Sequence, residues 1–343
     1  MPKSWRSSGP LRNSRLERKA KSGFALSAAL KLVDEVLRGD KRAAAKLISM
    51  IEDDDAGASA ALAEIFPHTG TAHIVGLTGP PGVGKSSLIN RLVREYRERS
   101  KKVGVVAVDP TSPFTGGAVL GDRIRMADTG TDPGVFIRSM ATRGHSGGLA
   151  LATFDAVRVL DAMGSDIVLI ETVGAGQSEV EIATRAHTIV VVEMPLSGDV
   201  VQTMKAGILE IGDVYVVNKV DLGNEDVLVA NLKFQLEARD GWTPPIIRTA
   251  ALEGRGIDEL AAALDKHAAF LEASGLRRKR ELARARLEIL ENVQRLLARR
   301  VAAGSQTGAA FEHLANDVAD RKTDPHAAAM KLLKTASPTR RSP

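Results

Sequence analysis

Apolar and polar positions follow a helical pattern in the N-terminal part of the chain. Over residues 25–66, apolar side chains recur every three or four positions, the spacing of one face of an α-helix. Gly39 and Asp40 interrupt the pattern and are suited to end one helix and cap the next. The positions expected to face the core are Leu26, Leu30, Val33 and Leu37, then Leu47, Ile48 and Ile51. We therefore predict an N-terminal helical arm over residues 23–70, preceded by a disordered basic tail over residues 1–22.

From His73 onward the pattern changes to short β-branched runs separated by stretches of helical length. The predicted strands are Ile74–Leu77, Val103–Val108, Ile167–Ile170, Ile189–Val192, Val214–Val217 and Ile246–Thr249, with Val135–Met140 as a candidate seventh. This alternation is typical of an α/β fold whose mainly parallel sheet is covered by helices on both faces. We assign residues 71–272 to that domain.

A third pattern begins after Gly275. The basic cluster Arg277–Arg280 opens a long amphipathic helix, and a final helix begins at Asp324, where aspartate can cap and Pro325 can take the first helical position. The apolar stripe of the long helix runs through Leu282, Ile289, Val293 and Leu296 toward Val301. Because residues 273–343 are too few to bury this stripe, we expect it to pack on the chain's own α/β domain or on a second subunit.

Composition narrows the class of protein. The 343 residues are 44% hydrophobic and 3% aromatic and contain no cysteine, which excludes disulfides, thiolate metal sites and cysteine nucleophiles and fits a cytoplasmic protein. No segment approaches the roughly 18 apolar residues of a membrane span, and no signal-peptide core follows the basic N-terminus. The net charge of +5 gathers at the chain ends, which favours solvated tails over nucleic-acid or membrane binding.

The most specific motif lies directly after the first predicted strand. It is a complete G-x-x-x-x-G-K-S loop formed by Gly79, Pro80, Pro81, Gly82, Val83, Gly84, Lys85 and Ser86. In such a loop, backbone N–H groups surround phosphate oxygens, the lysine reaches the β- and γ-phosphates, and the serine hydroxyl can bind Mg²⁺. The helix predicted over Ser87–Tyr96 directs its N-terminus toward the same anion. The fold class is therefore a P-loop NTPase with helical extensions at both ends.

A second motif, Asn218-Lys219-Val220-Asp221, follows the strand Val214–Val217 and identifies the base. The Asp221 carboxylate can accept hydrogen bonds from N1–H and the amino group of guanine, whereas adenine presents an acceptor at N1. Lys219 can lie along the base, and Asn218 can tie this loop to the phosphate loop. The segment Thr249-Ala250-Ala251 resembles the base-binding S-A-x loop of GTPases, with an ordinary strand-to-helix turn as the alternative.

Acidic residues near strand ends suggest a metal site and a switch. With Ser86, the candidate Mg²⁺ ligands are Asp109, Asp122 and Glu171, and hard oxygen ligands of this kind suit Mg²⁺. Glu171 opens a segment that stands where many GTPases carry D-x-x-G, so that Gly174 can offer its N–H to the γ-phosphate. Lys85 and Glu171 are candidate catalytic residues. Gln177 can orient the attacking water or belong to a plain loop.

Two further features stay open. Arg123, Arg125, Arg143 and Arg185 are candidate charge stabilisers, and their spacing singles out none. The segment Met140–Gly148 is rich in glycine and polar residues; it is either an element that reports the nucleotide state or a helix N-terminus without a signalling role.

Taken together, these motifs resemble those of the MeaB/ArgK family of metallochaperone-type P-loop GTPases. The resemblance rests on Gly79–Ser86, Val108–Ser112, Gly121–Met126, Glu171–Ser178 and Asn218–Asp221, and extends to Gly39–Arg42 and Asp324–Ala328. It implies a GTPase with GTP or GDP and Mg²⁺, slow intrinsic hydrolysis and partner stimulation. The implied partner is an adenosylcobalamin-dependent acyl-CoA mutase, whose cofactor loading such proteins gate and which they protect or reactivate.

The resemblance also implies a homodimer joined through the C-terminal helices, and it makes a cobalamin adenosyltransferase a candidate partner. No recognisable motif binds cobalamin directly. The served mutase is open among methylmalonyl-, isobutyryl-, 2-hydroxyisobutyryl- and ethylmalonyl-CoA mutases.

Three alternatives are weighed against this interpretation. A metal-insertion GTPase for urease or hydrogenase would want His-rich or Cys ligands, whereas this chain has seven scattered histidines and no cysteine. Asp221 argues against a transport-associated ATPase or kinase. A nucleic-acid-associated GTPase would want aromatic stacking residues, and we find no recognisable RNA-binding module.

Overall fold

The computed structural model describes residues 26–55, 57–109, 131–141, 148–172, 185–195, 210–303 and 305–336. The chain divides into two compact units, Met1–Arg280 and Glu281–Pro343. Of the predicted features, the basic tail, Asp122, Gly174 and Gln177 lie outside the described residues.

The first unit is built on a parallel sheet of seven strands in the order β3-β2-β4-β1-β5-β6-β7. The strands are β1 (His73–Thr78), β2 (Val103–Asp109), β3 (Val135–Ala141), β4 (Ile167–Glu171), β5 (Thr188–Glu193), β6 (Val214–Val217) and β7 (Ile246–Arg248). Each predicted strand is present, including the candidate seventh. At the centre, Gly76 of β1 pairs with Ile170 of β4 and Ile189 of β5. The carboxyl end of β1, where the phosphate loop begins, therefore lies in the middle of the sheet.

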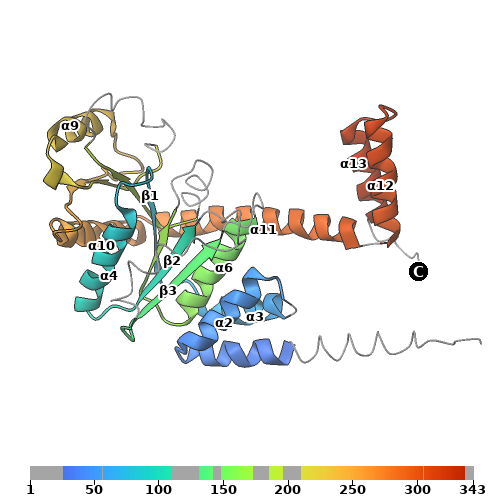
Figure 1. The fold of residues 1–343 in the computed structure, drawn as a ribbon, viewed down its shortest axis with the longest axis horizontal. Helices are drawn as coiled ribbons and strands as arrows, with labels where there is room; N and C mark the ends of the chain where they lie inside the picture. The colour runs from blue at the N-terminus through green and yellow to red at the C-terminus, as the bar shows by residue number, and fades with distance from the viewer. Residues whose placement is uncertain are drawn as a thin grey trace, which may run out of the picture. The chain divides into compact units, whose positions relative to one another are not determined.

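Helices cover both faces of this sheet, as the pattern predicts (Figure 1). On one face lie α4 (Lys85–Glu98) and α10 (Ile257–Ala273); on the other lie α6 (Gly148–Ala162), α9 (Glu225–Gln235), α2 (Lys41–Glu52) and α3 (Ala58–Ile65). Successive strand residues point to opposite faces, so that Val75 and Leu77 pack beside α4 while Ile74 joins the α6 side. Because helices cover both faces, the strand residues that point to either face are apolar.

The N-terminal arm packs against α6, and one detail of its prediction was wrong. Residues 26–37 form a helix, and Asp40 caps α2 by accepting a hydrogen bond from the Ala43 N–H at 2.8 Å. Leu26 and Leu30, however, are 40% and 38% exposed. Val33 is buried as predicted, and so are Leu47, Ile48 and Ile51, whereas the other buried residues of the first helix are Ala29, Leu32 and Val36. The buried face of this helix has the same helical spacing, and the small Ala29 side chain can lie within the core cluster.

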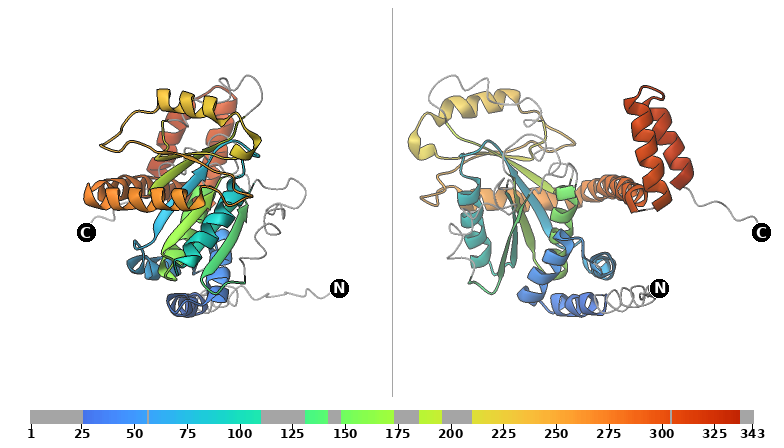
Figure 2. Two further views of the ribbon diagram at one scale, coloured as in Figure 1. Left: turned by 90° about the vertical axis from the view of Figure 1, so that its left-hand side faces the viewer. Right: turned by 45° about the vertical axis from the view of Figure 1, so that its right-hand side comes forward.

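Polar contacts from Lys41 and Arg138 fix the arm to β3 and to the turn before it. Lys41 donates to the Asp132 carbonyl at 2.6 Å, and Arg138 of β3 donates to Ser49 at 3.0 Å and pairs with Glu52. The turned views in Figure 2 show α2 and α3 beside α6. A short 3₁₀ turn, η1 (Phe66–His68), then leads into β1.

The second unit is helical. It contains most of α11 (Leu276–Ala303), with α12 (Ser305–Ala319) and α13 (Pro325–Ala336). The predicted long helix and final helix are confirmed, and Asp324 accepts from the Ala327 N–H at 2.9 Å as the predicted cap. Helix α12 was not predicted, because small residues occupy many of its positions and blur its apolar spacing. Within the described residues, no helix is long and apolar enough to cross a bilayer.

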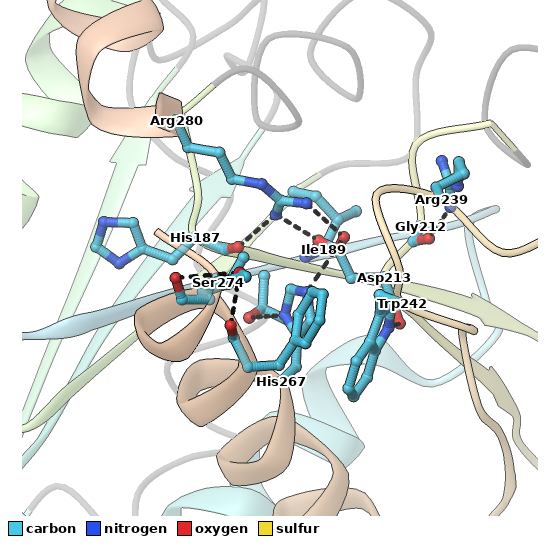
Figure 3. Close-up of polar contacts among 12 residues, drawn as sticks. His187, Ile189, Gly212, Asp213, Arg239, Trp242, His267, Ser274 and Arg280 are labelled. Atoms are coloured by element: carbon cyan, nitrogen blue, oxygen red, sulfur yellow. Dashed lines mark hydrogen bonds and ion pairs between the residues drawn. The ribbon is translucent and has the colours of Figure 1, made fainter. Parts of the chain in front are cut away.

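A buried polar cluster joins the first residues of α11 to the amino ends of β5 and β6 (Figure 3). The Asp213 carboxylate accepts two hydrogen bonds from Arg280 at 2.8 and 2.9 Å and one from the Ile189 N–H at 2.9 Å. His267 Nε2 lies 3.5 Å from the same carboxylate, and its ring packs against Trp242 with centroids 4.7 Å apart. The first residues of α11, up to Arg280, are thereby held within the first unit.

Candidate nucleotide-binding site

The phosphate loop occupies the connection between β1 and α4, and its glycines are required by space as well as by backbone angle. At Gly79, with φ 142°, an added Cβ would lie 2.1 Å from the Val192 carbonyl oxygen. At Gly84, with φ 98°, it would lie 2.4 Å from Asn218 Nδ2. A side chain at Gly79 would clash with the backbone of β5, and one at Gly84 would clash with the buried Asn218 amide, so glycine suits both positions.

Lys85 points back into this loop. Its buried ammonium group donates to the carbonyl oxygens of Gly79 at 2.7 Å and Pro80 at 3.0 Å. The loop thus holds a positive charge at the N-terminus of α4, where backbone N–H groups also favour an anion. Helix α4 begins at Lys85, two residues before the predicted start, because Gly84 adopts the left-handed conformation that ends the loop and caps the helix.

Ser86 and Glu171 are brought together from α4 and β4. The Ser86 hydroxyl donates to Glu171 Oε1 at 2.6 Å, and Glu171 is 7% exposed. Because the hydroxyl proton is committed to the carboxylate, the serine oxygen keeps its lone pairs. Two hard oxygen ligands therefore lie beside the phosphate loop, and this donor set fits Mg²⁺. Asp109 ends β2, but its side chain lies outside the described residues.

Thr172, which lies inside the predicted Glu171–Gly174 segment but had no role of its own there, secures the end of β4 against β1. Its N–H and hydroxyl both donate to the Leu77 carbonyl, at 3.2 and 3.3 Å. These contacts hold the residue after Glu171 against the end of β1, the strand that leads into the phosphate loop. No spacing signal identifies such a residue, since its partner lies in another strand.

Asn218 connects its own loop to two others, and its predicted contact with the phosphate loop is confirmed. Its Nδ2 donates to the Val83 carbonyl at 2.8 Å, while its Oδ1 accepts from the Thr249 hydroxyl at 2.9 Å and from the Ala251 N–H at 3.2 Å. The side chain is 1% exposed, so these bonds are shielded from water. One residue thereby fixes the spacing between the phosphate loop and the segment Thr249–Ala251.

The other residues expected to bind the base are arranged around Asn218, and we call the turn formed by residues 249–255 the base loop. Lys219 has φ 62°, and this turn leads into the 3₁₀ helix η3 (Val220–Leu222), where Asp221 is exposed. Ala250 pairs with Arg255 through two backbone hydrogen bonds of 3.1 and 3.3 Å. The segment is therefore a closed turn next to an exposed carboxylate, and the two together can accept and donate hydrogen bonds to a planar ring.

The other candidates are only partly visible. Arg185 is 2% exposed, with its guanidinium carbon 4.9 Å from the Phe154 ring centroid, while Arg123, Arg125 and Arg143 lie outside the described residues. Of the segment 140–148, residues 142–147 lie outside them too. Within the described ranges, no group of three or more metal-ligating side chains stands together.

The sheet order, the glycine-bounded phosphate loop and the Ser86–Glu171 pair define the fold as that of a P-loop nucleotide-binding protein. Residues 44–306 match the family described as methylmalonyl-CoA mutase-associated GTPase MeaB. The chain belongs to this family of P-loop GTPases, and the resemblance read from the motifs is confirmed.

Individual relatives agree with this assignment. A putative GTPase of Pyrococcus abyssi is 47% identical over 309 residues, which cover 88% of this chain and 95% of the relative. GTPase ArgK of Escherichia coli is 34% identical, covering 69% of this chain and 75% of the relative. A methylmalonic aciduria type A homolog, mitochondrial, of Caenorhabditis elegans is 34% identical, covering 76% and 66%.

Among solved structures, a LAO/AO transport system kinase superposes with a TM-score of 0.65 and 24% identity, covering 90% of this chain and 97% of that one. This likeness concerns the fold alone.

Proposed function

We propose that this MeaB-family GTPase binds Mg²⁺–GTP at the phosphate loop, reads guanine with Asp221, and uses the nucleotide state to control an adenosylcobalamin-dependent acyl-CoA mutase. The observation that carries the nucleotide part is the set of three Asn218 contacts, which hold the phosphate loop and the base loop at a fixed spacing. A nucleotide needs such spacing because its base and phosphates bind at separate loops.

Asp221 is the proposed guanine reader. Its exposed carboxylate lies in η3. The nearby base loop is closed by the two backbone hydrogen bonds between Ala250 and Arg255. A carboxylate next to a base accepts from the N1–H and amino group of guanine, and adenine would leave it facing an acceptor. The backbone of Thr249–Ala251 would contact the other edge of the ring.

The hydrolytic chemistry needs positioning and charge more than covalent participation. Lys85 supplies a buried positive charge and can exchange a carbonyl contact for phosphate oxygens. Ser86 and Glu171 would hold Mg²⁺ with Asp109 and Asp122, and when bound the ion neutralises charge on the β- and γ-phosphates. Gly174 is the proposed γ-phosphate contact, and Gln177 the proposed residue that orients water. We expect slow turnover without the partner.

The base assignment is tested by Asp221→Asn. The amide can donate to the xanthine oxygen, so preference should shift from GTP to XTP in both binding and hydrolysis, with ATP as the negative control. Glu237→Gln, at an exposed carboxylate just after helix α9, is the matched control and should keep GTP preference. Unchanged GTP affinity in Asp221→Asn would remove Asp221 from the site.

The mutase role is supported by the family to which the chain belongs and by the C. elegans relative named for methylmalonic aciduria. We expect the purified chain to bind one of the candidate acyl-CoA mutases differently with GDP and with a non-hydrolysable GTP analogue, and to change its loading with adenosylcobalamin. A cobalamin adenosyltransferase should be included as a second bait. If no mutase of the source cell responds in either assay, this part of the proposal fails.

The proposed homodimer uses the apolar stripe of α11. Within the second unit, Leu282, Ile289, Val293 and Leu296 are all exposed, and burial in a second copy would remove this apolar surface from water. Because Arg277 and Arg280 bond to residues of the first unit, the chain should be cut after Arg280 and not before Arg277. Light scattering should then give a monomer that still binds GDP. A dimer that survives this truncation would place the contact elsewhere.

A further inference from the structure

Arg91 is a charged residue of α4 that the nucleotide motifs do not include. It lies on the second turn of the helix that begins at Lys85. Its Nε donates to the Ala251 carbonyl at 2.8 Å, and its NH2 group donates to the Leu252 carbonyl. One guanidinium thus bonds two successive carbonyls of the base loop, a geometry that a flexible ammonium does not reproduce.

Ala251 is held at both of its backbone polar groups as a result. Its N–H donates to Asn218, and its carbonyl accepts from Arg91 and, at 3.3 Å, from the Gly254 N–H. Asn218 fixes the base loop to Val83 of the phosphate loop, whereas Arg91 fixes it to the helix that follows. The base loop is therefore bound from both sides of the phosphate site.

Further along α4, separate contacts hold the same pair of elements together. Tyr96 donates to Asp265 of α10 at 3.2 Å, and Arg99 pairs with the same carboxylate at 2.9 Å. The apolar residues of α4 and α10 also share one core cluster. The packing of α4 on α10 therefore does not depend on Arg91, whose two hydrogen bonds go only to the base loop.

We infer that Arg91 is a positioning residue for base recognition, which holds Ala251 and Leu252 where the purine ring binds. This inference rests on the proposed guanine nucleotide site. Removal of the guanidinium would take its donor from the Leu252 carbonyl, leave the Ala251 carbonyl with only the 3.3 Å contact from the Gly254 N–H, and let the loop leave the ring-binding position. The phosphate contacts of Lys85 and Ser86 would be unchanged. The energetic loss should therefore depend on the base and not on the phosphates.

The test compares a nucleotide with the right base and one with the wrong base. Dissociation constants of Mg²⁺–GDP and Mg²⁺–ADP are measured by competition for wild type, Arg91→Ala, Arg91→Lys and the exposed control Arg94→Ala, which lies on the same helix. For Arg91→Ala we expect GDP binding to weaken about tenfold, the equivalent of one charged hydrogen bond, with ADP binding unchanged. Arg91→Lys should fall between Arg91→Ala and wild type, and Arg94→Ala should match wild type.

The outcomes separate the inference from the proposed function. If wild type prefers GDP but Arg91→Ala weakens GDP and ADP equally, or neither, Arg91 has no role specific to the base and the inference is wrong. If wild type does not prefer GDP over ADP, guanine recognition itself fails and the inference fails with it. Should Arg91→Ala not fold, Arg91→Gln provides the same comparison, since its amide keeps one donor group.

Discussion

The Asp213–Arg280 pair allows the strength of one buried ion pair within the first unit to be measured. We choose Arg280→Met, which keeps an unbranched apolar stem and removes the guanidinium with its charge. Asp213 then retains the Ile189 N–H and the nearby His267 ring but loses both guanidinium bonds. The Asp213 side chain is 9% exposed, so water replaces those bonds poorly.

The magnitude follows from burial. Removing one partner of a buried ion pair costs about 3–5 kcal/mol, because the other charge is left uncompensated. The Arg280 side chain is 35% exposed, so we take a lower figure, about 2–3 kcal/mol of unfolding free energy. Lys279→Met is the matched control. Lys279 lies 3.8 Å from Asp240 with side chains 73% and 60% exposed, and its loss should cost less than about 1 kcal/mol.

Urea unfolding followed by Trp242 fluorescence is the assay. Trp242 donates to the Asp213 carbonyl oxygen at 2.8 Å and therefore reports on this cluster, and Trp5→Phe removes the other tryptophan. Adding Asp213→Asn completes a double-mutant cycle, in which the double variant should lose less than the two single losses combined. If Arg280→Met costs no more than Lys279→Met, or if the cycle is additive, the reasoning that this pair is strongly coupled is refuted.

Two further predictions concern acid stability and the phosphate loop. Burial lowers the pKa of His267 to about 4 and that of His73 to about 3, so below pH 6.5 the unfolded chain binds protons that the folded chain refuses. Stability should be insensitive to these groups above pH 7 and fall by about 2 kcal/mol from His267 alone by pH 5. As pH falls from 7 to 5, the urea midpoint of His267→Gln should decrease less than that of wild type, whereas that of His313→Gln should follow wild type. Equal pH slopes for His267→Gln and wild type would contradict the role given to His267. Gly84→Ala should abolish GDP binding because its Cβ would push the Asn218 side chain away. Gly70→Ala is the control: its φ of 102° imposes a similar backbone strain, but the space around its Cβ is open, so GDP binding should be kept. Equal GDP affinities of the two variants would contradict this reasoning.

The sequence predicted the strands of the sheet well because each is a local run of apolar residues. Val214–Val217 is present with the predicted bounds, and Val135–Met140 lengthens only to Ala141. Strands buried on both faces leave a continuous apolar signal, which turns and polar helix ends interrupt clearly. The caps at Asp40 and Asp324 were equally local, since each bonds to an N–H three residues ahead.

Where several helical faces were available, local spacing was insufficient. Leu26 and Leu30 have large apolar side chains and are exposed, yet Ala29 and Val36 of the same helix are fully buried. The choice depends on which side of the helix faces the core cluster, and a small residue there allows closer packing. Helix α12 escaped prediction for a related reason, because its many small residues give a weak periodic signal.

The sequence by itself determined the class of site: a phosphate loop from Gly79 to Ser86, a carboxylate at Asp221 suited to guanine, and the family to which the chain belongs. Only the tertiary structure decided which side chains hold these loops in register. Ser86 meets Glu171 across 85 positions, and Arg91 meets Ala251 across 160. A motif is recognised because its residues are close together in the sequence. The Ser86–Glu171 and Arg91–Ala251 contacts instead depend on the order of the strands in the sheet and on the helices packed on it, and no local sequence pattern encodes that order.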